Sequence, residues 1–466
     1  MEKKRVAFES LGCKLNYAET VQIEKEFRQR GFEVVDPSAS ADVFVINTCT
    51  VTQSADSDCR QIVRRALRSS PDAFVVVTGC YAQGKPEEVA NIDGVDLVLG
   101  AKEKFHLFDF VDGFSKSHHN GDGPEANYHG RVFVSPIEDL VEFGAADSAV
   151  DNARLRAETP ASSETLSADT HSGVQVRTRA FLKIQDGCDY NCSYCTIPRV
   201  RGKSRSPSIS FVVDEARQIA AAGFKEVVLS GVNVGDYGSR DGRSLLELLK
   251  ALEQVDGISR YRISSIEPNL LSREIVKLVS SSAKFCKHFH IPLQSGADEV
   301  LKRMRRRYNT GQYKEIVGYV RELMPEAGIG ADVIVGFPGE TNEIFEKSMN
   351  FIENLSLSYL HVFSYSEREG TASAGFGGNV DPRVKRKRSE LLRMISTKKR
   401  YEFNRQFVGK ITKVLAEEEV KNGKIYGFTS NYIRVEMDAN PMHVNEISDV
   451  LITGVSDNTA LGQVIL

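Results

Sequence analysis

Six short apolar segments between residues 180 and 365 alternate with helical patterns, and this alternation restricts the possible folds more than any other feature. Strands separated by helices pair in parallel, because a parallel connection needs a crossover that a helix usually supplies. Six such strands predict an incomplete β/α barrel, although the rhythm alone also suits a doubly wound open sheet. The segments are AFLKIQ (180–185), EVVLSG (226–231), RYRISS (260–265), HFHIPL (288–293), GADVIVGF (330–337) and YLHVFSY (359–365).

The first 115 residues have the same α/β rhythm. Helical patterns at 19–29 and 54–68 lie between apolar segments, which predicts an open, flavodoxin-like parallel sheet. Its predicted strands are RVAFES (5–10), DVFVIN (42–47), AFVVVTG (73–79) and DLVLG (96–100). Residues 116–175 lose the rhythm and are rich in Ser, Ala, Gly and Asp, so we interpret them as a polar linker with a short strand and turn in RVFVSPIEDLVEF.

The C-terminal part of the chain begins with a long helical pattern. This predicted helix, 384–403, has Leu391, Leu392 and Ile395 on one face. Short alternating strands follow it and predict a small all-β barrel of OB-like size. These strands are KITKVLAE, KIYGFTSN, YIRVEM and VLITGV. The predicted domains are therefore 1–115, the linker 116–175, 176–402 and 403–466.

Cysteine use and hydropathy indicate the compartment. We find no apolar run of about 18 residues, the length that a membrane helix needs. The first residues, MEKKRVAFESLGC, lack the apolar core of a signal peptide, so a cytoplasmic protein without a membrane partner is expected. In that reducing compartment, the clustering among the 8 cysteines favours metal or redox chemistry over disulfides.

Three cysteines, Cys188, Cys192 and Cys195, follow directly on the strand segment AFLKIQ with the spacing C-x3-C-x2-C. A short loop lets three thiolates converge, and soft thiolates suit an iron–sulfur cluster. Zinc usually takes four ligands, so three thiolates with no local fourth partner favour a four-iron cluster with one open iron.

Three more cysteines each lie just past a predicted N-terminal strand: Cys13, Cys49 and Cys80. The carboxyl ends of parallel strands share one edge of a sheet, so these thiols are expected to meet there and hold a second cluster. The alternative is that they are three small buried residues. Cys59 and Cys286 do not follow strands, and we interpret both as structural.

The segments SLGCKLNYAET, NTCTVT, TGCYAQ and GCDYNCSYCTIPRVRG together resemble the radical S-adenosylmethionine (SAM) methylthiotransferase family. The resemblance covers nearly the whole chain except 116–175. It implies an N-terminal three-cysteine domain, a radical SAM core and a C-terminal β-domain called TRAM. GCKLNYAET and NTCTVTQSADSDCRQIVRRA look most like the subgroup that acts on threonylcarbamoyladenosine at position 37 of tRNA, beside the anticodon.

The resemblance implies two 4Fe–4S clusters and SAM as cofactors. SAM would chelate the open iron of the Cys188–Cys195 loop and yield a 5′-deoxyadenosyl radical, while the second cluster would present the sulfur. It also implies a set of SAM-binding residues, most of which follow barrel strands: Tyr194, Gly231, Asn233, Ser265, Glu267, Gln294, Val335 and Gly336. Taken one at a time, the Gly-rich segments are also ordinary turns. His288 and His290, which alternate on one strand, are expected to be packed barrel histidines.

The charge is unevenly distributed, which bears on the partner. Residues 1–175 carry 18 basic and 28 acidic residues, whereas 176–466 carry 42 and 35. The basic helix 383–400 and KRMRRRY (302–308) could bind phosphates of a tRNA anticodon stem-loop. Tyr426, Phe428 and Tyr432 could stack on bases, although core packing is the favoured interpretation. The chemistry also needs an electron donor and a sulfur source, and the chain's features fit a monomer.

Other functions remain open at this point. The substrate could be isopentenyladenosine in tRNA or an aspartate of a ribosomal protein. The chain could also be a non-catalytic electron carrier with two clusters, which the complete set of strand-end motifs argues against.

Overall fold

The computed structural model describes residues 3–50, 53–111, 113–116, 130–144, 178–421, 423–439 and 444–465. The chain forms two compact units, which are described one at a time. One consists of residues up to 176 together with 186–189 and 195–205, and the other of 177–185, 190–194 and 206–466. Within the described ranges, no helix is both long and apolar enough to cross a membrane.

The first unit contains a six-stranded parallel sheet in the order β2-β1-β3-β4-β5-β6. Its strands are β1 (Arg5–Ser10), β2 (Glu33–Val35), β3 (Val43–Thr48), β4 (Phe74–Gly79), β5 (Leu97–Leu99) and β6 (Arg131–Phe133). The helices of this unit are α1 (Lys14–Gln29), α2 (Gln53–Ser69), α3 (Cys80–Gly84), α4 (Pro86–Ala90) and α6 (Ile197–Arg201). The order of the first five strands is that of flavodoxin-like sheets, as expected.

This sheet has a hydrophobic core on each face. Every residue of β3 and β4 is buried because both faces of the sheet are covered. Parallel strands of this kind have unbroken apolar sequences. The sheet extends past residue 115, because β6 lies within the segment assigned to the linker and pairs with β5. The rest of that segment, 117–129 and 145–175, lies outside the described residues.

The second unit begins with six parallel strands that follow one another in chain order. Two three-stranded sheets, β7-β8-β9 and β10-β11-β12, are joined by parallel bridges from Tyr261 to Phe285 and from Ser265 to His290. The strands are β7 (Arg179–Lys183), β8 (Glu226–Ser230), β9 (Arg260–Ile263), β10 (His288–His290), β11 (Gly328–Val335) and β12 (Tyr359–Ser364). In a doubly wound sheet the order of the strands in space would reverse part-way along the chain. Because β7 to β12 are neighbours in chain order, they form the incomplete β/α barrel.

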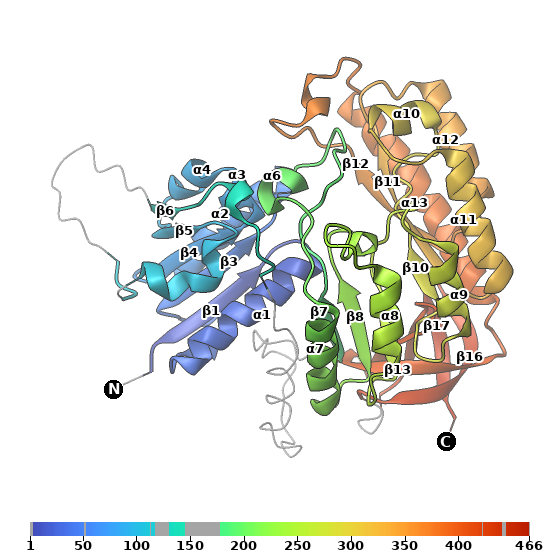
Figure 1. Cartoon of the computed structure of the whole chain (residues 1–466), viewed down its shortest axis with the longest axis horizontal. Coiled ribbons are helices and arrows are strands. Elements are labelled where there is room, and N and C mark those ends of the chain that lie inside the picture. Colours follow the sequence, from blue (N-terminus) through green and yellow to red (C-terminus); the bar gives the residue numbers. More distant parts are fainter. Residues whose placement is uncertain are drawn as a thin grey trace. The chain divides into compact units, whose positions relative to one another are not determined.

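Helices connect these strands and lie along one side of them (Figure 1). They are α7 (Ile209–Ala221), α8 (Leu245–Glu253), α9 (Arg273–Ser281), α10 (Asp298–Arg303), α11 (Thr310–Leu323) and α12 (Asn342–Asn354). Local sequence fixes their starts: α8 and α11 begin with capping boxes, Ser244 with Glu247 and Asn309 with Gln312.

The chain ends in a closed barrel, β13-β14-β15-β17-β16, as the alternating pattern predicts. Its strands are β13 (Ile411–Lys421), β14 (Lys424–Thr429), β15 (Arg434–Asp438), β16 (Ile447–Ser456) and β17 (Thr459–Val464). The preceding helix, α13 (Pro382–Arg405), buries Leu392, whereas Leu391 and Met394 are exposed. The predicted apolar face of this helix is therefore wrong at Leu391.

Two arginines of β9 join the C-terminal barrel to the β/α barrel. Arg260 donates to the carbonyls of Phe428 (3.0 Å) and Lys413 (2.8 Å), and Arg262 to those of Ser430 (3.0 Å) and Thr429 (3.1 Å). Glu226 pairs with Arg262 at 2.7 Å and balances its buried charge.

The aromatic residues of the C-terminal barrel take part in this packing. Tyr432 stacks on Phe428 at 4.9 Å, and the ring of His288 lies 4.7 Å from Tyr432. Phe428 also faces the guanidinium of Arg179. These contacts agree with the favoured interpretation of Phe428 and Tyr432 as packed side chains.

Candidate functional site

Three cysteines lie at the carboxyl ends of three adjacent parallel strands in the first unit. Cys13 follows β1, Cys49 follows β3, and Cys80 opens α3 directly after β4. The strand order reverses between β1 and β3, and ligands of open α/β sheets bind at such a switch point. Cys13 and Cys49 flank that point.

The loop after β1 leaves room for the Cys49 thiol. Gly12 has φ +95, and a Cβ on it would come within 2.7 Å of the Cys49 Sγ atom. Burial raises the pKa of Cys80 to about 11, and the neighbouring thiols of Cys13 and Cys49 add to this effect. The three thiols are thus close enough to affect the charge of Cys80, and a side chain at Gly12 would collide with Cys49.

A buried network of charges lies behind these thiols in the same unit. The Arg201 guanidinium contacts Glu19 at 2.9 Å, Asp186 at 3.0 Å and the side-chain oxygen of Asn16 at 2.6 Å. Lys104 contacts Glu19 at 2.6 Å. Although burial alone would lower the pKa of Arg201, the surrounding negative groups raise it well above its usual value. Arg201 thus remains a cation, and its charge opposes the burial effect on Cys80.

The second cysteine group lies in the loop between β7 and α6. Residues 186–189, which include Cys188, and 195–205, which begin with Cys195, belong to the first unit, whereas Cys192 belongs to the second. The backbone N–H of Cys188 donates to the carbonyl of Gly202 at 3.0 Å. The loop therefore returns on itself after its third cysteine.

Arg306 lies beside the Cys192 thiol. Its Nη1 atom is 3.1 Å from the Cys192 Sγ atom, and the guanidinium pairs with Glu267. Burial raises the pKa of Cys192, and the charge of Arg306 opposes that rise. Arg306 was predicted to bind phosphates as part of KRMRRRY; for this residue the prediction is wrong, because its side chain is buried on an internal carboxylate.

Two predicted SAM-binding residues, Gly231 and Asn233, both lie next to the side chain of Gln185. The N–H of Asn233 donates to the Gln185 side-chain oxygen at 2.9 Å, and a Cβ on Gly231 would lie 3.0 Å from that side chain. The Asn233 side-chain oxygen faces the N–H of Glu267 at 3.4 Å. Its buried Nδ2 has no hydrogen-bond partner among the described residues, so a donor is available for a bound acceptor.

The other predicted SAM-binding residues lie along the same barrel. Tyr194 packs on Phe337 with ring centroids 6.3 Å apart, and Arg306 reaches its hydroxyl at 3.4 Å. Val335 is buried at the end of β11, and the N–H of Gly336 donates to Glu340 at 2.7 Å. Contacts through Gln185 and Arg306 thus link Gly231, Asn233, Glu267 and Tyr194, and Tyr194 also packs on Phe337, which follows Val335 and Gly336 at the end of β11.

Gln294 has a left-handed backbone, with φ 63. Its N–H donates to the carbonyl of Asp332 at 2.7 Å, and its carbonyl accepts from Ile334 at 2.9 Å. Non-glycine residues in this region cost roughly 1 kcal/mol or more and cluster at functional sites. The strain therefore indicates that the side chain of Gln294, which follows β10, has a functional role that offsets its cost in stability.

We expect Gln294→Gly to raise the free energy of unfolding by up to about 1 kcal/mol, because glycine adopts this φ without strain. The measurement is the thermal midpoint, together with SAM binding by equilibrium dialysis, which should weaken. Gln254→Gly is the matched control, since Gln254 has φ −83 and should lose stability. A lower midpoint for Gln294→Gly would contradict the strain argument.

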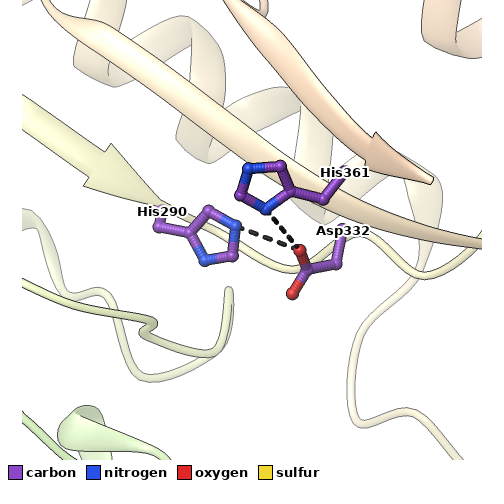
Figure 2. Close-up of side chains that lie close together, drawn as sticks. All are labelled: His290, Asp332 and His361. Atoms are coloured by element: carbon purple, nitrogen blue, oxygen red, sulfur yellow. Dashed lines mark ion pairs between the residues drawn. The ribbon is translucent and has the colours of Figure 1, made fainter. Parts of the chain in front are cut away.

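His290 is packed in the barrel as expected, but it also contacts a carboxylate that was not predicted. His288 is packed as expected, with its ring stacked on Tyr359. His290 lies 3.1 Å from the carboxylate of Asp332, which also lies 3.3 Å from His361 (Figure 2). Sequence analysis missed Asp332 and His361. A carboxylate inside the apolar segment GADVIVGF was a usable signal for Asp332, whereas nothing local marks His361.

Comparison with known proteins identifies the family. Residues 182–352 match the family described as the Radical SAM superfamily, and residues 5–100 match the one described as Uncharacterized protein family UPF0004. The threonylcarbamoyladenosine tRNA methylthiotransferase MtaB of Bacillus subtilis is 37% identical, with 96% of this chain and 93% of that protein covered. The chain belongs to the radical SAM methylthiotransferase family.

Further relatives share this full-length similarity. The protein named MtaB in Aquifex aeolicus is 36% identical, covering 93% of this chain and 97% of that one. A tRNA-2-methylthio-N(6)-dimethylallyladenosine synthase of Akkermansia muciniphila is 30% identical, covering 98% of each chain. Among solved structures, the radical SAM methyltransferase TsrM of Kitasatospora setae has a TM-score of 0.54 at 15% identity, covering 78% of this chain and 75% of that one, which supports the fold.

Membership of this methylthiotransferase family makes the chain an enzyme that uses SAM and a 4Fe–4S cluster. The residues present fit both groups. Soft thiols in a strand-end loop suit iron, and a cation beside Cys192 stabilises negative charge on sulfur. The unpartnered Nδ2 of Asn233 offers a donor to the polar groups of SAM. The electron-carrier alternative does not agree with an enzyme family.

Proposed function

We propose that this methylthiotransferase attaches a methylthio group to C2 of N6-threonylcarbamoyladenosine at position 37 of tRNAs. The similarity over nearly the full chain to the B. subtilis and A. aeolicus proteins, whose names state this substrate, carries the proposal. The subgroup motif GCKLNYAET supports the same substrate. The dimethylallyladenosine relatives make that nucleoside the second candidate.

The proposal assigns the two cysteine groups to two clusters. Cys188, Cys192 and Cys195 would hold the cluster at which SAM binds, and Cys13, Cys49 and Cys80 a second cluster. When bound, these groups supply radical chemistry and sulfur, which the unactivated C–H bond at C2 of adenine requires because no side-chain base can remove its proton.

The chain's own side chains would control the charge at both groups. Arg306 lies beside Cys192 and is fixed by Glu267, so its cation would stabilise thiolate ligands. Arg201 would stabilise thiolate ligands in the same way near Cys80, and its pairs with Glu19 and Asp186 hold it in position. Both side chains are buried, which keeps each guanidinium in place and little screened by salt.

The proposed tRNA contact is the basic surface of α13. Arg383, Arg386, Lys387 and Arg393 are exposed on this helix, and exposed arginines and lysines bind phosphates. Two other basic residues of α13 have internal roles. Arg388 pairs with Glu340, and Lys399 donates to the carbonyls of Glu353 and Leu355. The phosphate-binding face is therefore narrower than the count of basic residues suggests.

Mass spectrometry of tRNA nucleosides from a strain lacking the gene, with and without its restoration, tests the substrate. We expect 2-methylthio-N6-threonylcarbamoyladenosine only on restoration. The matched control is Cys59→Ala, which removes a buried core thiol of the first unit and should keep the product.

Each other outcome replaces the proposal with a specific alternative. If the methylthio form of isopentenyladenosine responds instead, the enzyme has the second substrate. If every tRNA nucleoside is unchanged while a ribosomal protein changes in mass, the ribosomal aspartate is the substrate.

A further inference from the structure

His290, Asp332 and His361 come from three neighbouring strands and gather on one side of them (Figure 2). Asp332 of β11 pairs in register with His361 of β12, and His290 of β10 pairs with Gly330 of β11. One carboxylate oxygen of Asp332 lies 3.1 Å from Nε2 of His290 and 3.3 Å from Nδ1 of His361. One ligand atom from each residue lies within 4.8 Å of the other two.

The surrounding residues hold the His290 ring in one orientation. Its Nδ1 lies 2.8 Å from the Ser265 hydroxyl, which leaves Nε2 directed toward the cluster. Metal-binding histidines commonly hydrogen-bond through the other ring nitrogen in this way. Nε2 is buried and faces the Asp332 carboxylate oxygen at 3.1 Å (Figure 2). Nε2 of His290, this Asp332 oxygen and Nδ1 of His361 are thus gathered at one place.

Asp332 is fixed from its backbone side. Its carbonyl accepts from the N–H groups of Leu293 and Gln294, so the strained end of β10 supports the strand that carries the carboxylate. The ring of His361 lies between those of His290 and Tyr359, at 5.4 Å and 5.3 Å. The three groups are therefore positioned before any ligand arrives.

The charge of the cluster calls for a cation. One oxygen of the Asp332 carboxyl group lies within 3.3 Å of a ring nitrogen of each histidine. With Asp332 ionised and both imidazoles neutral, the cluster carries one uncompensated negative charge, at a place where His290 and Asp332 are partly buried and His361 is exposed. A divalent ion would neutralise that charge and take up the lone pairs of both imidazoles. A protonated histidine would neutralise it as well, and this is the competing explanation.

We propose that His290, Asp332 and His361 bind a divalent first-row transition metal ion. Two imidazoles and one carboxylate are the ligand set of catalytic zinc sites and of non-haem iron(II) sites. Three protein ligands leave further coordination positions for water or for an oxygen of a bound molecule. This site uses none of the six cysteines assigned to the clusters.

Zinc binding to the reconstituted holoenzyme tests the site. The protein is incubated with a small excess of Zn²⁺, desalted, and analysed for zinc and iron by mass spectrometry. We expect about one zinc ion per chain, as for a three-ligand site, and loss of that zinc in His361→Ala and in Asp332→Asn with iron unchanged. His288→Phe is the matched control: it alters the same strand and keeps a ring against Tyr359, so its zinc should stay.

Zinc K-edge absorption distinguishes this site from the cysteines. Nitrogen and oxygen ligands with imidazole scattering are expected, and sulfur ligands would place the zinc on the cluster thiols and overturn the proposal. Equal zinc in the parent, His361→Ala and Asp332→Asn would overturn it too. If the parent retains no zinc after this incubation, the metal site does not exist.

Discussion

Replacing Cys49 with alanine is expected to remove about half of the bound iron and to abolish methylthio transfer, while reductive cleavage of SAM continues. Cys49 lies at the end of β3 beside Gly12, far along the chain from the loop of Cys188. Losing one of three thiolates leaves a cluster without enough ligands, but it leaves the other cysteine group intact. Iron and sulfide analysis, together with the yield of 5′-deoxyadenosine, measures both effects.

The reciprocal variant makes this prediction specific. Cys188→Ala should also lose about half of the iron, but it should stop SAM cleavage. Cys59→Ala should keep all the iron, since its thiol packs in the hydrophobic core of the first unit. Loss of SAM cleavage in Cys49→Ala with its iron half retained would show that the two cysteine groups do not divide the chemistry in this way.

Replacing Arg201 with methionine is expected to destabilise the first unit by about 3–5 kcal/mol, because it leaves Glu19 and Asp186 as buried charges with one cation fewer. The chain has no tryptophan, so fluorescence is a poor probe. Hydrogen exchange resolved by peptide is the measurement, and the amides of β1, β3 and β4 should lose protection.

An exposed arginine of the same helix gives the matched control. Arg199→Met removes the same kind of charge from α6, but at the surface, and should change protection little. Arg201→Lys should fall between the two, since an ammonium group cannot bind Glu19, Asp186 and Asn16 in the planar arrangement of a guanidinium. Equal protection in Arg201→Met and Arg199→Met would show that the network contributes little to stability.

The apolar strands of both α/β parts could be predicted from sequence because burial on two faces leaves long apolar runs. β3 and β4 lie within one residue of their predicted bounds. β2 and β17 were missed for opposite reasons. β2 has only three residues, EVV, and β17 is a mixed segment, TALGQV, whose pairing with β15 and β16 decides its structure.

The candidate site was less predictable because its contacts join distant parts of the chain. The strand-end rule anticipated where Cys13, Cys49 and Cys80 lie. It could not reveal that Arg201 pairs with Glu19, which lies 182 residues earlier in the chain. The basic segment KRMRRRY gave no sign that Arg306 differs from its neighbours, because its partner Glu267 lies after another strand.

Arg260 and Arg262 of β9 donate four hydrogen bonds to backbone carbonyls of the C-terminal barrel, and Arg262 also faces the ring of Tyr432. Every residue type offers the same carbonyl, so the side chains of β13 and of the β14–β15 turn can change without removing these four hydrogen bonds. Such a connection tolerates exchange of one small β-barrel for another with the same strand ends. A barrel exchanged at this position would keep the four carbonyls in place, while Arg260, Arg262 and Glu226 stay on the β/α barrel.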